Sequence, residues 1–102
     1  MLDLHLNVNP HTAKRLKKII ESYSDPEAFA QNVIGYQLSE LKRGILNLQL
    51  DLREYESQYQ MSSADFYQHF SQGELDDREA FITWAGLYEM LLENEARLQE
   101  LA

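Results

Sequence analysis

The chain has 102 residues, of which 44% are hydrophobic and 25% charged, so it can form one small folded domain and its composition excludes wholesale disorder. It contains no apolar run of about 18 residues, and its N-terminus lacks the basic and apolar regions of a secretory signal, so we expect neither a membrane span nor secretion. The absence of cysteine excludes disulfides and thiolate metal sites, which indicates a cytoplasmic protein.

The net charge of −8 is unevenly distributed along the chain. Residues 1–43 carry six Lys or Arg against five Asp or Glu, whereas residues 44–102 carry three Arg against twelve acids. This asymmetry predicts two regions, 1–43 and 44–102, that contact different partners. A solvated acidic surface is the simpler alternative.

The first element in the chain has the pattern of a strand. Residues 2–8 alternate strictly between apolar and polar side chains, which is the period of a half-buried strand. Pro10 ends it, because proline cannot donate a hydrogen bond to a neighbouring strand. A lone strand cannot satisfy its own backbone, so the pattern predicts pairing with the same strand of a second copy.

Two helices are predicted to follow this strand. Pro10 suits the first turn of a helix that reaches about Tyr23, and Asn9 is its expected cap. Ser24 or Asp25 then caps a second helix that starts at Pro26.

The second helix carries the strongest pattern of the sequence, a heptad seam in which apolar residues recur at alternating spacings of four and three. The seam comprises Ile34, Leu38, Leu41, Ile45, Leu48, Leu52, Tyr55 and Tyr59. It predicts a helix over 26–59, on the order of 50 Å long, whose seam must be covered by another helix of this chain or of a second subunit. Residues 46–52 also alternate like a strand, but the heptad continues on both sides and favours the helix.

The remainder of the chain is predicted to form two further helices. Ser62 and Ser63 cap a short helix over about 64–72, Gly73 ends it, and Asp76 with Asp77 caps a last helix over about 78–101. The expected fold is therefore mainly α: a short N-terminal strand plus helices in a ribbon-helix-helix-like dimer, with a long heptad-patterned central helix and two C-terminal helices.

No group of residues points to catalysis. His5, His11 and His69 lie on the expected strand, the start of the first helix and a distant short helix, and none has a second ligand at helical spacing, so no metal site is expected. The chain also lacks a glycine-rich phosphate loop, a serine elbow and a cysteine nucleophile. We expect no enzymatic activity, no cofactor and no small-molecule substrate.

A strand followed by two helices is the order of a ribbon-helix-helix protomer, whose strands pair between two copies and can enter the major groove of DNA. The inward side chains of the ribbon and the first part of the seam would form the dimer contacts: Leu2, Leu4, Leu6, Val8, Ile34, Leu38, Leu41, Ile45 and Leu48. The outward side chains, the cations of the first helix and the start of the second helix would contact DNA: Asp3, His5, Asn7, Lys14, Arg15, Lys17, Lys18, Asp25 and Pro26.

The order of these elements and a recurring pattern in the second half resemble a known family. The pattern comprises Asp51-Leu52, Glu54-Tyr55-Glu56, Tyr59, Met61-Ser62-Ser63, Phe66-Tyr67, Phe70, Gly73-Glu74-Leu75, Phe81 and the run from Trp84 to Glu89. The chain is similar to bacterial antitoxins of type II toxin–antitoxin modules that have a ribbon-helix-helix-like head and a helical arm. This resemblance implies a homodimer or higher homo-oligomer whose head binds operator DNA and whose arm neutralises a toxin, often a nuclease.

The arm is expected to bind the toxin through large side chains, since aromatic residues dominate interface energetics. These are Phe66, Tyr67, Phe70, Phe81, Trp84, Tyr88 and Leu91. The alternative is that they form the core between the last two helices. At the level of the whole protein, the alternative is a coiled-coil homo-oligomeric adaptor or assembly protein without a role in nucleic-acid binding.

Overall fold

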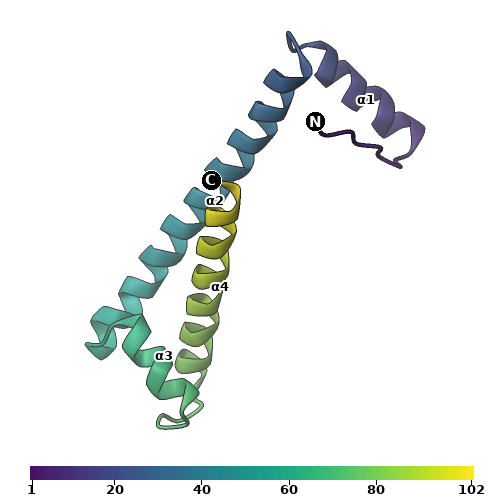
Figure 1. Ribbon diagram of the computed structural model, residues 1–102. Coiled ribbons are helices and arrows are strands. Elements are labelled where there is room, and N and C mark those ends of the chain that lie inside the picture. Colours follow the sequence, from purple (N-terminus) through teal and green to yellow (C-terminus); the bar gives the residue numbers. More distant parts are fainter. The chain divides into compact units, whose positions relative to one another are not determined.

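The computed structural model describes all 102 residues and contains four α-helices and no strand (Figure 1). They are α1 (Pro10–Glu21), α2 (Pro26–Tyr59), α3 (Ser63–Ser71) and α4 (Glu79–Leu101). Helix makes up 76% of the chain. No helix is both long enough and apolar enough to cross a membrane.

The expected N-terminal strand is wrong. Residues 1–9 form neither helix nor strand, and the ribbon-helix-helix fold is not seen. A strand requires a neighbouring strand to exchange backbone hydrogen bonds, and every other regular element of this chain is helical. The alternating pattern of residues 2–8 therefore has no partner within the chain.

The chain forms two compact units, which we call unit 1 (Met1–Gly35) and unit 2 (Tyr36–Ala102). The division falls inside α2, earlier in the chain than the expected division after residue 43. The two units differ in their interiors, because every buried residue of the chain belongs to unit 2.

Unit 1 consists of residues 1–9, α1 and the first turns of α2. The expected cap of α1 is confirmed, because the Asn9 side chain accepts a hydrogen bond from the Thr12 backbone N–H at 2.9 Å. Asp25 does the same for α2, with its Oδ1 accepting the Ala28 N–H at 2.7 Å. Next to this turn the rings of Tyr23 and Phe29 meet edge to face, with centroids 5.7 Å apart.

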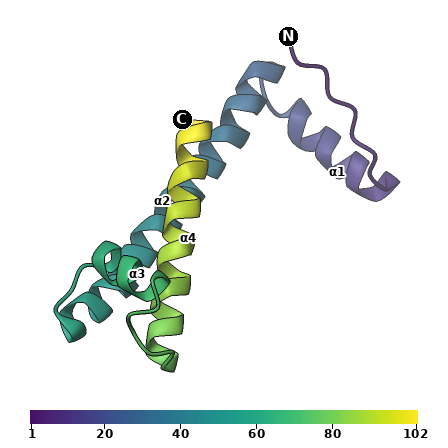
Figure 2. The same ribbon diagram turned by 60° about the horizontal axis from the view of Figure 1, so that its bottom comes forward.

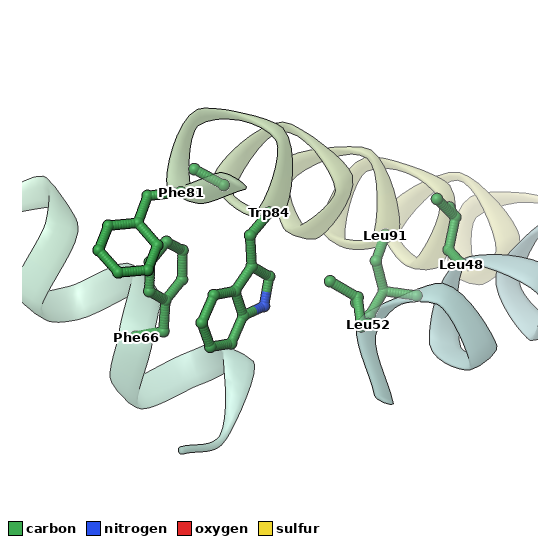
Figure 3. Packing of buried hydrophobic residues seen from close by; sticks show 7 residues of the cluster. Leu48, Leu52, Phe66, Phe81, Trp84 and Leu91 are labelled. Carbon is green, nitrogen blue, oxygen red and sulfur yellow. The ribbon is translucent and has the colours of Figure 1, made fainter. Parts of the chain in front are cut away.

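In unit 2, α4 runs antiparallel beside α2, and α3 packs where α2 ends and α4 begins (Figures 1 and 2). The part of the heptad seam beside α4 thereby receives its cover from the same chain. Leu48 and Leu52 are buried together with Leu91 of α4 (Figure 3).

Aromatic rings form the other end of this core. Phe66 and Trp84 are fully buried, and their rings stack nearly parallel with centroids 3.7 Å apart (Figure 3). Tyr55 and Tyr59, the last two seam residues, each stack on Trp84 at 5.6 Å. Phe81 contacts Phe66 at 5.4 Å. Together these rings join α2, α3 and α4 at one place.

Of the helix ends predicted in unit 2, the end of α3 is confirmed and the start of α4 differs. Gly73 ends α3 as expected and has a φ of 75°, a conformation that glycine adopts without steric cost. The expected cap of α4 by Asp76 or Asp77 is wrong, because Arg78 occupies the cap position and makes no capping bond with its side chain. Asp76 is instead held by the guanidinium group of Arg78, at 2.8 Å and 2.7 Å, and accepts the backbone N–H of Arg78 at 3.1 Å.

Candidate protein-binding surfaces

The residues expected to contact a toxin lie in or against the core of unit 2. Four are buried: Phe66, Phe81, Trp84 and Leu91. The other three, Tyr67, Phe70 and Tyr88, are half-buried and pack against that core. A partner could reach the buried four only if α4 separated from α2 and α3, so this conformation presents other side chains to solvent.

The residues expected at a dimer contact divide into three groups. Leu2, Leu4, Leu6, Val8 and Ile34 are exposed; Leu38, Leu41 and Ile45 are half-buried; and Leu48 is buried in the core of unit 2. The middle of the seam is therefore already covered within the chain. The exposed residues all belong to unit 1.

The residues expected to bind DNA lack the ribbon that would present them. Asp3, His5 and Asn7 are exposed in the segment that forms no strand. Asp25 and Pro26 begin α2, with Asp25 engaged as its cap. The four cations of α1 are exposed: Lys14, Arg15, Lys17 and Lys18. Lys14 and Lys18 lie opposite Leu16 and Ile20, whereas Lys17 lies beside Ile20 and Arg15 lines a hollow with Leu16 and Ile19.

One face of α4 was not anticipated from the sequence. Its members recur at helical spacings on the side away from the core, and we call them the α4 outer face: Ile82, Gly86, Glu89, Met90, Glu93, Arg97 and Glu100. Ile82 and Met90 are 55% and 52% exposed. This face therefore combines apolar side chains with three carboxylates and one guanidinium group.

Glu89 has a defined position on the α4 outer face. Its Oε1 accepts a hydrogen bond from the hydroxyl of Tyr67 on α3 at 2.7 Å. The same bond, with a smaller contribution from burial, raises the pKa of the Tyr67 hydroxyl, because the ionised phenol could no longer donate to the carboxylate. The side chain of Glu89 is thus ordered by α3.

The opposite side of α2 from the seam carries a different combination, which we call the α2 outer face: Arg43, Leu46, Leu50 and Glu54. Leu46 and Leu50 are 55% and 49% exposed. Helical spacing would have identified this face once the buried side of α2 was known. The pair Leu46 and Leu50, four residues apart, was the available signal.

A hollow of about 390 Å³ in unit 2 lies beside α2, the start of α3 and α4. Its lining includes Arg53, Glu56 and Tyr88. Glu56 is engaged in the fold, because its Oε2 accepts the backbone N–H of Ser63 at 2.9 Å. No group of three or more His, Asp or Glu side chains is placed to hold a metal ion.

Comparison with known protein families, with curated proteins and with solved structures produced no match. The functional conclusion therefore depends on the residues and surfaces described above.

Proposed function

We propose that this protein is an antitoxin of a type II toxin–antitoxin module, which neutralises a basic protein toxin by binding it directly through unit 2. The single observation that carries the proposal is the concentration of negative charge on a folded helical unit. Unit 2 carries thirteen Asp or Glu against five Lys or Arg, a net charge of −8, while unit 1 carries four of each and is neutral.

The chemistry of the toxin follows from this charge. A protein that acts on RNA exposes a basic surface to bind phosphates, and a negatively charged unit is attracted to such a surface and competes for it. A nuclease is therefore the class of toxin that suits unit 2 best. In this proposal both proteins are cytoplasmic.

The α4 outer face is the part of unit 2 that best suits such a partner. Interfaces combine exposed apolar side chains at their centre with polar groups at their rim. Ile82 and Met90 supply the first, and Glu93 and Glu100 supply the second. The aromatic residues behind them support the helix that presents this face.

The test is coexpression of the full chain with the product of the neighbouring reading frame in its operon. The expected results are relief of the growth arrest that the neighbour causes alone, and copurification of the two proteins in a complex that weakens as salt is raised. If the neighbour is harmless, or if it forms no complex with this chain, the proposal fails.

Charge reversal locates the contact. The double variant Glu93→Lys/Glu100→Lys should weaken the complex at least about tenfold, since rim charges across an interface steer and hold a partner of opposite charge. The matched control is Asp51→Lys/Glu54→Lys on α2, which changes the net charge by the same amount at exposed positions. If both variants lost the same affinity for the toxin, the net charge of the protein rather than the α4 outer face would account for binding, and the assignment to that face would fail.

Autoregulation through operator DNA is a second part of the proposal. It is supported by the four exposed cations of α1, which could contact phosphates without reading bases. An electrophoretic shift with the promoter of the operon tests it, with Lys14→Gln/Lys17→Gln expected to abolish the shift. A chain that associates with itself but binds neither toxin nor promoter would support the alternative, an adaptor protein.

A further inference from the structure

Gly86 leaves an open position on the α4 outer face. It has no side chain, and a Cβ atom placed there would meet nothing within 4 Å. The residues three and four positions away on a helix surround such a position, and here they are all exposed: Ile82, Thr83, Glu89 and Met90. We call Gly86 and these four neighbours the Gly86 site. Another molecule can approach the backbone of α4 closely there, because no side chain stands in its way.

The neighbours of Gly86 differ in their chemistry. Ile82 and Met90 are apolar, and they lie about one turn before and one turn after the glycine. Glu89 supplies a carboxylate on the side of α4 next to α3, where the hydroxyl of Tyr67 donates to its Oε1 at 2.7 Å. The Gly86 site therefore offers an apolar surface with one negative charge at its edge.

The side chain that holds Glu89 is itself fixed. Tyr67 and Tyr88 pack against the core of unit 2, and their ring centroids lie 5.2 Å apart. The Tyr67 hydroxyl is a neutral donor, so the carboxylate keeps its full charge in a defined place. Glu89 would lose little conformational freedom on pairing with a cation, and its Oε2 is available to accept hydrogen bonds.

Other carboxylates of unit 2 that the fold holds in place are less suited to a partner. Glu40, Glu74 and Asp76 each already bind a basic side chain of this chain. Glu56 is half-buried and accepts a backbone N–H. Among these ordered carboxylates, Glu89 alone is both exposed and held by a neutral side-chain donor.

We propose that the Gly86 site binds one arginine side chain of the partner protein. The guanidinium group pairs with Glu89, and the aliphatic part of the arginine lies over Gly86 between Ile82 and Met90. This inference rests on the proposed function for the identity of the partner, because a toxin that acts on RNA uses arginines to bind phosphates. The carboxylate of Glu89 then takes the place of an RNA phosphate on the toxin.

Both parts of an arginine match this site. Its guanidinium group is planar and donates two parallel hydrogen bonds to a carboxylate, which fixes orientation as well as charge. Its methylene groups lie along apolar surface while the charged end stays in a polar environment. The ammonium group of lysine is more strongly hydrated and makes a point contact, and lysine is depleted at interfaces where arginine is enriched.

Substitution of Gly86 separates binding at this site from the stability of α4. Gly86→Gln fills the open position with a better helix former. It should weaken binding of the neighbouring gene product at least about tenfold in isothermal titration calorimetry, while the melting temperature stays the same or rises. The control is Gly35→Gln on α2, where an added Cβ atom also meets nothing within 4 Å, and this variant should bind normally. Unchanged affinity in Gly86→Gln, or an equal loss in Gly35→Gln, would overturn the proposal.

Removal of single charges tests the carboxylate. Glu89→Gln should weaken the complex at least about tenfold. Glu93→Gln removes the same charge from the same face but should cost less than about threefold, because Glu93 lies one turn before Arg97, which offsets its charge. Equal losses in the two variants would overturn the assignment to Glu89.

Tyr67 is a positioning residue in this proposal. Tyr67→Phe should weaken the complex about threefold by itself and should add nothing to the loss in Glu89→Gln, because the hydroxyl acts only through the carboxylate. Losses that add in the double variant Tyr67→Phe/Glu89→Gln would exclude this role.

The partner provides the last measurement. Its arginines are replaced by lysine one at a time, and one replacement should weaken the complex as much as Glu89→Gln does and add nothing to that variant. If no arginine is coupled to Glu89 while the unmodified chain still binds and neutralises the toxin, the arginine site is wrong and the proposed function stands. If the unmodified chain forms no complex with the neighbouring gene product, both fail.

Discussion

The indole N–H of Trp84 donates a 2.8 Å hydrogen bond to the hydroxyl oxygen of Ser63, where Trp84 is fully buried and Ser63 is 3% exposed. The bond joins the first residue of α3 to the second turn of α4. No buried side-chain nitrogen or oxygen in the molecule lacks a hydrogen-bond partner. The serine therefore allows the largest ring of the core to be buried without an unpaired donor.

Ser63→Ala should destabilise unit 2 by about 1–3 kcal/mol, because the indole N–H would remain buried without an acceptor. Urea unfolding followed by tryptophan fluorescence measures this change. Ser62→Ala is a useful comparison, since Ser62 caps α3 from an exposed position through the Asp65 N–H and should cost only about 1 kcal/mol. A loss at Ser63 smaller than that at Ser62 would contradict the importance of the buried bond.

The end of α2 offers a stabilising substitution. Gln60 has a φ of 54°, a left-handed conformation that costs energy for any residue with a Cβ atom. Gln60→Gly should raise the free energy of unfolding by up to about 1 kcal/mol, because relief of the left-handed conformation outweighs the freedom that glycine adds to the unfolded chain and the loss of an exposed side-chain bond to Ser57. Gly73→Ala, at a φ of 75°, should have the opposite sign in the same assay. If both changes had the same sign, backbone strain would not be the cause.

Helical glycines should respond to the space around them. A methyl group at Gly86 would meet nothing within 4 Å, so Gly86→Ala should stabilise α4 by up to about 1 kcal/mol. A methyl group at Gly44 would lie 3.4 Å from the side-chain amide of Asn94, so Gly44→Ala should stabilise the protein no more than Gly86→Ala does. Thermal unfolding of the two variants checks the order. A larger gain at Gly44 would contradict the close approach of α2 and α4 there.

Asp76 should titrate at unusually low pH. The guanidinium group of Arg78, aided by the backbone N–H of Arg78, lowers the pKa of this carboxyl from 3.8 to about 2. Because the folded pKa lies below the unfolded value, the pair stabilises the fold above about pH 4, and this contribution disappears as the pH falls towards 2. Carbon-detected NMR titration measures the pKa. In Arg78→Gln it should return towards 3.8, and an unchanged low value would exclude Arg78 as the cause.

Unit 2 should fold without unit 1. All eight buried residues of the chain lie between Leu48 and Leu91, so residues 36–102 contain the complete core. A fragment of these residues should unfold cooperatively, and the midpoint of its unfolding transition should equal that of the full chain. A fragment without cooperative unfolding would show that residues before Tyr36 contribute to that core.

The helices could be predicted from the sequence because single capping residues mark where three of them begin. Asn9, Asp25 and Ser62 each accept the backbone N–H three residues later, as capping residues do. The heptad from Ile34 to Tyr59 predicted the long helix. The prediction that another helix covers the seam was correct for the portion beside α4. The prediction that Asp76 caps α4 was wrong, because the carboxylate of Asp76 binds the guanidinium group of Arg78 two residues later.

The absence of a strand at residues 2–8 and the burial of the large aromatic residues could not be predicted from the sequence, for physical reasons. An alternating run such as residues 2–8 shows that two sides of a segment differ, but hydrogen bonds from another strand decide whether it becomes a strand. Likewise, the spacing of Phe66 and Trp84 is the same in a core and in an interface. Their burial depends on α3 turning back against α4. The two outer faces were missed because they are defined only after the inner faces are known.

The distribution of buried residues has a consequence for how mutations act in the two parts of the chain. A substitution in the aromatic core alters one molecule by itself, and its effect is the same at every concentration. A substitution among the apolar residues before Gly35 removes no buried contact of this chain, because none of those residues is buried. Variation in the first third of the chain would therefore leave the melting temperature of the remainder unchanged, whereas variation in the aromatic core would lower it.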